Sequence, residues 1–244
     1  MSLKENVLKL LEIGYQEQLA FIERLTDDER AVVGTPDQWS AKNVLSHILA
    51  WNEDMLVRFE AIRQGQPLPP ELEGEIDHQN LHLYEAHKDD SWATVRQIAD
   101  TLYQRIVQFV QDSSEADLLD RAQMPPASSD SMRPWRWIVG STVTHTLLHL
   151  ADYDAKHRRQ DHSTQIQEVL AAQLISMIDE PAWHGEVIYN LGCYYAISGQ
   201  KEKAIGKILE ALALRPDLLE WSKQDSDLNS IRDDARFQAL YVAP

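Results

Sequence analysis

Cysteine, basic side chains and long apolar runs are all scarce in this chain, and each scarcity excludes a class of protein. Cys193 is the only cysteine among 244 residues, so no intrachain disulfide can form and a reducing compartment is expected. Lys and Arg number 23 against 39 Asp and Glu, a net charge of −16 that disfavours nucleic acid and anionic membranes as partners. No run is apolar enough to span a bilayer and no apolar segment follows a basic start, so we expect a cytoplasmic protein.

The spacing of apolar residues along the chain is typical of a helical protein. Apolar side chains recur every three or four residues, as on one face of an amphipathic helix. The expected helices cover residues 3–26, 41–64, 76–112 and 134–158, with a break at 88–91 and a short turn at 115–119. Polar, proline-containing segments separate them. This order predicts an all-α protein whose first domain, residues 1–160, is a four-helix bundle.

Two histidines in the last of these helices suggest a metal site. His145 and His149 are four residues apart, so both imidazoles are expected on one helix face. Such a pair can bind a transition metal together with a third ligand from elsewhere. His47 is the candidate, because it lies within the apolar stripe of the helix over 41–64 and should point into the bundle. The spacing also fits ordinary histidines in a polar core layer, since the pair lacks the glutamate of a His-Glu-x-x-His motif.

Other polar side chains are weaker candidates. His78 and His82 form a second pair at the same spacing, in a segment with less regular helical periodicity, and we rank it below the first pair. Asp54, Asp152 and Tyr153 are the catalytic candidates, as side chains that would orient a ligand or move a proton. A solvated helix face is the alternative for each acid.

Three neutral imidazoles would leave open positions on Zn²⁺, Ni²⁺ or Fe²⁺. A metal held in this way can bind a thiolate, or lower the pKa of a bound water toward ~7. Either supplies a nucleophile for an electrophilic small molecule. The residues therefore predict a metal-dependent transferase or hydrolase.

Residues 161–244 read as a second module. A helix is expected at 164–179, and a short capping helix after Asp225. Between them, residues 184–218 resemble the tetratricopeptide repeat, a 34-residue helix pair with small residues where the helices touch. The positions that carry this resemblance are Ile188, Leu191, Gly192, Tyr195, Ala204, Ile208, Ala211 and Pro216. One repeat cannot bury its own faces, so either the flanking helices close the stack or the repeat packs on the bundle. Cys193 is expected to be buried and unreactive.

Four short motifs in the first domain resemble a known family. They are Trp39-Ser40 ahead of Ser-His-Ile-Leu-Ala-Trp-Asn, then Asn80-Leu-His-Leu-Tyr-Glu-Ala, Ser91-Trp-Ala-Thr-Val, and a late Thr-x-x-His-x-x-x-His. Together they resemble the DinB-like four-helix bundles, nearest the ClbS/DfsB branch. The resemblance implies a divalent metal held by one histidine of the second helix and two of the fourth, which match His47, His145 and His149. It also implies a homodimer, and relatives that are thiol-dependent transferases and isomerases.

The sequence is also compatible with two alternative functions. The ClbS/DfsB branch includes a metal-free resistance protein that hydrolyses the cyclopropane warhead of a genotoxin, although this chain departs from it by keeping all three histidines. A metal-free hydrolase or binder of a reactive compound would use a pocket lined by four tryptophans: Trp39, Trp51, Trp135 and Trp137. The alternative role for these tryptophans is ordinary packing in the core. In the other alternative the protein is a non-catalytic scaffold that binds a peptide or protein through residues 164–244.

Overall fold

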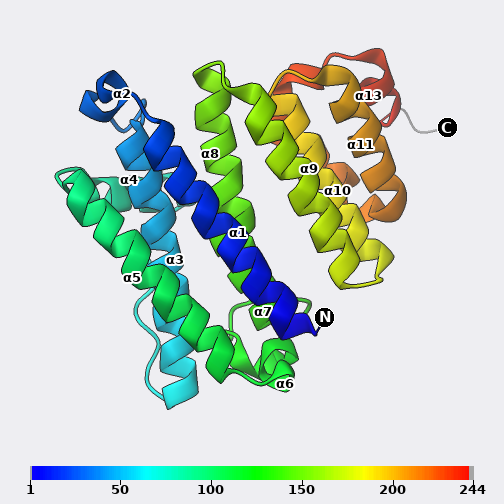
Figure 1. Cartoon of the computed structure of the whole chain (residues 1–244). Helices are drawn as coiled ribbons and strands as arrows, with labels where there is room; N and C mark the ends of the chain where they lie inside the picture. The colour runs from blue at the N-terminus through cyan, green and yellow to red at the C-terminus, as the bar shows by residue number, and fades with distance from the viewer. Residues whose placement is uncertain (1, 242–244) are drawn as a thin grey trace. The chain divides into compact units, whose positions relative to one another are not determined.

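The computed structural model describes residues 2–241, and the chain divides into two compact units, Met1–His149 and Leu150–Pro244. The predicted all-α class is confirmed: the regular secondary structure of the described residues is helical, apart from an isolated bridge between Thr35 and Gln38 (Figure 1). Across these described residues no helix has the length and apolar character needed to cross a membrane.

The first unit is built on four long helical segments. They are α1 (Leu3–Arg24), α3 (Ala41–Gln64), α5 (Trp92–Asp112), and α7 (Pro134–Val139), which continues through Gly140–Thr144 into the start of α8 (His145–Lys156). The boundary between the two units falls within α8, after His149. Shorter helices connect them: α2 (Asp27–Ala31), α4 (Ile76–His87), α6 (Glu115–Leu119) and a 3-10 turn at Arg121–Gln123. Both α1 and α3 pack against α5 and against Gly140–Thr144, so the apolar stripes of the four segments meet in one core (Figure 1).

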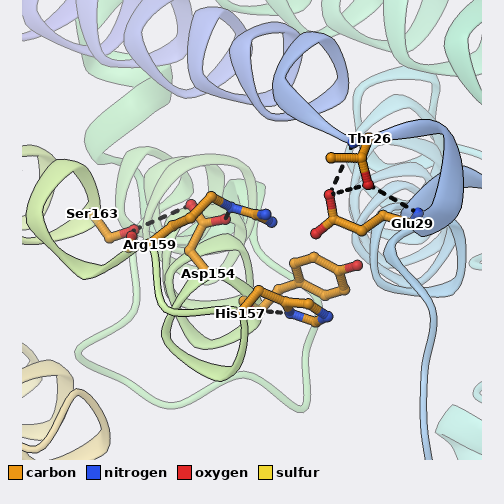
Figure 2. A network of polar contacts seen from close by, with 7 residues as sticks. Thr26, Glu29, Asp154, His157, Arg159 and Ser163 are labelled. Carbon is orange, nitrogen blue, oxygen red and sulfur yellow. Dashed lines mark hydrogen bonds and ion pairs between the residues drawn. The ribbon is translucent and has the colours of Figure 1, made fainter.

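Capping residues set the helix starts that the sequence predicts. The Ser40 hydroxyl accepts from the Asn43 backbone N–H, and the Asn43 side chain accepts from the Ser40 N–H, which starts α3. Gly65 ends this helix in the left-handed conformation, at φ 63°. Thr26 and Glu29 form the same reciprocal cap at α2, as Figure 2 shows.

The segment predicted as one helix over 134–158 contains a π turn. Gly140–Thr144 is π-helical, and the His145 backbone N–H bonds to the Gly140 carbonyl five residues back. Gly14 of α1 lies against this turn, and a Cβ at Gly14 would stand 3.1 Å from the Thr142 carbonyl oxygen. The apolar periodicity of the sequence hides the extra residue, because both flanking helices keep a regular pattern. The helix also ends at Lys156, two residues earlier than predicted.

The second unit is a stack of helices around α10 (Pro181–Ile197). This helix packs against α9 (Gln160–Met177), α11 (Lys201–Leu214) and the 3-10 turn Ser226–Ile231. Gly192 allows α10 and α11 to approach, since a Cβ there would lie 2.7 Å from Ile208 Cδ1. The end of the chain differs from the single capping helix that was expected. It forms short pieces instead: Pro216–Leu218, α12 (Leu219–Ser222), Ser226–Ile231 and α13 (Ala235–Ala239).

The turn between α8 and α9 is tightly organised. Arg158 takes a left-handed φ of 61°, and α9 begins at Gln160, four residues earlier than predicted. The Asp154 carboxylate is 1% exposed and accepts from Arg159 Nε at 3.0 Å and from Ser163 Oγ at 3.2 Å (Figure 2). A buried carboxylate with charged and neutral donors fixes local geometry. The charged segment between α8 and α9 is therefore a short hydrogen-bonded turn.

Candidate metal centre

The three predicted histidines meet inside the first unit. His47 comes from the first half of α3, and His145 and His149 from the first turns of α8. The Nε2 atom of His145 lies 3.3 Å from Nε2 of His47 and 3.0 Å from Nε2 of His149. One ring nitrogen from each residue lies within 4.8 Å of the other two. His47 is buried, whereas His145 and His149 are partly exposed, so the group lies at the edge of the core.

Hydrogen bonds among the three rings cannot satisfy all of the converging ring nitrogens. The Nε2 of a neutral imidazole carries either one hydrogen or one lone pair, so that of His145 cannot bond fully to both neighbours. A cation would accept a lone pair from each ring. Two nitrogens bound to tetrahedral Zn²⁺ at ~2.0–2.1 Å lie about 3.3–3.4 Å apart, close to the separations found here. The donor set and its spacing therefore fit a divalent transition metal.

Burial keeps the rings of His47 and His145 neutral. Desolvation, followed by the neighbouring His149 and His145, lowers the pKa of His47 to about 3. Desolvation and His149 likewise lower the pKa of His145 to about 3. Metal ligation requires the neutral imidazole, so the protein environment favours the ligating form across the physiological range.

Comparison with known proteins identifies the family. The model of the DinB superfamily matches residues 10–160, more than half of the chain. The chain belongs to the DinB superfamily. Members of this superfamily often bind divalent metals, and in this DinB chain the group that could hold one is His47, His145 and His149. No curated protein and no solved structure gives a match.

Aromatic rings position His47 in this DinB bundle. The Trp39 ring centroid lies 4.7 Å from that of His47, and the Trp51 centroid lies 6.4 Å away, nearly perpendicular to it. The His47 Nδ1 atom is buried without a hydrogen-bond partner. Many metal-bound histidines are oriented by a hydrogen bond from the second nitrogen. Here packing against Trp39 does this for His47.

The predicted acidic residues and Tyr153 are engaged elsewhere. Asp54 forms a two-point ion pair with Arg58, at 2.7 Å and 3.0 Å. Asp152 pairs with Lys156 at 2.7 Å. The Tyr153 ring stacks on His157 with centroids 4.0 Å apart. Neither aspartate belongs to the group of converging ligand atoms. Their assignment as catalytic residues stays a prediction.

The competing histidine pair lies outside this centre. His78 is exposed and its Nδ1 contacts the Glu73 carbonyl at 3.1 Å, and His82 is also exposed. One group escaped the sequence reasoning: Cys193, Asp225 and Asp227 bring ligand atoms together in the second unit. The Asp225 carboxylate there accepts from Tyr189 Oη at 2.9 Å and from the Asp227 N–H. Cys193 Sγ lies 3.7 Å from the same carboxylate, which accounts for this group as a hydrogen-bonded core contact.

Proposed function

We propose that this DinB protein binds a divalent transition metal through His47, His145 and His149 and acts on electrophilic small molecules as a transferase or hydrolase. The observation that carries the proposal is the convergence of three Nε2 atoms from two separate helices. Zn²⁺, Ni²⁺ and Fe²⁺ all accept imidazole ligands, so the metal is named only as a class.

The chain's own residues supply ligation and shape. The bound metal would activate a thiolate or a water as the nucleophile. His47 is held in place because its side chain is buried and its ring packs against Trp39 and near Trp51. His145 and His149 are partly exposed, which leaves an approach for a small molecule on their side. Asp152 and Asp54 remain candidates for proton transfer only if their ion pairs with Lys156 and Arg58 open.

Elemental analysis tests the proposal. Untagged protein offered Zn²⁺, Ni²⁺ and Fe²⁺ in turn should retain about one metal per chain. The double variant His47→Ala, His145→Ala should lose it, while the control His82→Ala, at an exposed histidine outside the group, should keep it. Equal absence of metal from the wild type and the double variant sinks the proposal.

A metal-free function is the second candidate. Trp51 and Trp137 are partly exposed and line a common cavity, which favours a small-molecule site whether or not metal is present. This agrees with the proposed place of the chain near the ClbS/DfsB branch. Loss of an alkylating or cyclopropane probe at equal rates in wild type and in the His47→Ala, His145→Ala variant would select this candidate over the first.

We also propose that residues 161–244 form a tetratricopeptide-like module that follows a bundle of residues 1–160 in the chain. The end of the family match at residue 160 and the close α10–α11 approach at Gly192 support this division. A peptide or protein partner at residues 164–244, a homodimer and a cytoplasmic location belong to the same proposal. A pull-down whose partner is lost on deleting residues 164–244 is the test of the partner.

A further inference from the structure

A cavity of about 290 Å³ lies in the first unit, next to the aromatic wall of His47. Trp51 lines it, and the same ring lies 6.4 Å from the His47 ring, so the cavity and the metal centre share this tryptophan. Trp137 of α7 lines the cavity as well. The volume is near the lower end of small-molecule sites, about 300 Å³.

Two loops form the remaining walls, and one arginine organises each. Arg58 donates to the carbonyl oxygens of Pro69 and Pro70, both at 3.3 Å, which holds the segment after α3. Arg121 donates to the carbonyl oxygens of Pro125, Pro126, Ser128 and Ser129 in the segment before α7. Because these bonds fix the backbone on both sides, the cavity is formed before any ligand binds.

The charges that face the cavity favour one sign of ligand. Arg58 is 9% exposed at its side chain, and its N–H groups are used by Asp54 and the two proline carbonyls, so it cannot clamp an anion. Asp54 is neutralised by the same pair. Glu71, an exposed residue at the cavity rim, is the charged lining residue that makes no ion pair within the described part of the chain. Two tryptophan side chains in the lining and one unpaired carboxylate at the rim match an apolar body that carries an ammonium group.

We propose that this cavity is the substrate site and that its substrate class is small amphipathic amines, positively charged and with an aromatic or apolar body. This inference rests on the proposed function, because a ligand of the cavity is a substrate only if the metal centre acts on it. The net charge of −16 adds long-range attraction for cations.

Three matched probes test the charge preference on the full-length protein: phenethylamine, phenethyl alcohol and 3-phenylpropionate. Titration followed by tryptophan fluorescence and calorimetry should show saturable binding of the amine, about tenfold tighter than of the alcohol. The carboxylate should bind more weakly than either. Equal or tighter binding of the carboxylate, or no saturable binding of the amine, overturns the proposal.

Variants separate specific binding from general charge. Glu71→Gln should remove most of the preference for the amine over the alcohol, whereas Glu73→Gln, at an exposed glutamate outside the cavity lining, should leave it unchanged. Trp137→Leu should weaken both probes by about tenfold. If Glu71→Gln and Glu73→Gln behave alike, the cavity is not the site.

The His47→Ala, His145→Ala variant distinguishes the two proposals. Amine binding that persists in this metal-free variant supports the cavity even if the metal assignment fails. If the wild type binds metal but no amine, the proposed substrate site is rejected and the proposed metal centre is retained.

Discussion

Tyr15 illustrates at the residue scale how packing changes an ionisable group. Its ring stacks on Tyr103 with centroids 3.9 Å apart, and its hydroxyl donates to Asp100 at 2.7 Å. Burial, followed by the Asp100 hydrogen bond, raises the pKa of Tyr15 to about 12. The unfolded chain loses this proton near pH 10 while the folded protein keeps it. Stability from Tyr15 is therefore present below pH 10 and is lost as the pH rises toward 12.

This predicts a pH-dependent difference between wild type and Tyr15→Phe. The wild-type advantage in free energy of unfolding should shrink between pH 9 and pH 11, because only the wild type carries the titrating hydroxyl. Urea unfolding of both proteins at pH 9 and at pH 11 measures this difference in free energy of unfolding. A difference that stays constant or grows with pH would contradict the assignment.

Cys193 supports a second residue-scale prediction. The thiol is 4% exposed, and burial followed by the nearby Asp225 and Asp227 raises its pKa. Only the thiolate reacts with electrophiles. A colorimetric disulfide reagent should therefore modify the native protein on the order of 100-fold more slowly than the protein in denaturant. Fast modification of the native protein would show that the predicted inert role of Cys193 is wrong.

At the scale of elements, the close packing of α1 against the π turn leaves little space for a larger side chain at Gly14. Gly14→Ala would place a Cβ 3.1 Å from the Thr142 carbonyl oxygen, so the packed backbone of the π turn would have to give by a few tenths of an ångström. We expect a loss of about 1–3 kcal/mol in the free energy of unfolding. Gly206→Ala is the matched control, since nothing lies within 4 Å of its added Cβ in α11. It should gain up to about 1 kcal/mol from helix propensity.

Chemical denaturation of both variants measures these changes. Equal effects of the two substitutions would mean that α1 and the π turn are not closely packed. A further drop in metal content for Gly14→Ala alone would indicate that the π turn also positions His145, because that residue begins the helix directly after it.

At the scale of the whole molecule, the boundary between modules can be tested by truncation. A fragment of residues 1–160 contains all of α8 and the full family match, so it should fold and retain metal. A fragment ending at His149 lacks the second half of α8 and removes the packing of buried Leu150 and Ala151. It should be less stable and lose metal. Circular dichroism and elemental analysis compare the two, and equal behaviour would place the boundary at residue 149.

Local rules made much of this protein predictable. Ser40 with Asn43, Thr26 with Glu29, and Ser91 with Thr94 mark helix starts through side-chain caps that act over three residues. The i, i+4 spacing placed His145 and His149 on one face for the same reason. The π turn was not predictable, because it forms where α1 packs against it through the distant residue Gly14. The turn at Arg158 is held by residues close in sequence, Asp154 with Arg159 and Ser163, but its left-handed φ at a non-glycine residue has no sequence signal.

The sequence by itself determined the helical class, the caps, the acidic surface and the pairing of two histidines on one helix, since each follows from neighbours within about one turn. Only the tertiary structure decided that His47 reaches the same point, that Asp54 is bound to Arg58, and that two loops border an open cavity beside Trp51. These features join residues that lie far apart along the chain. Their distances are set by how α3, α7 and α8 pack, and no local pattern specifies that packing.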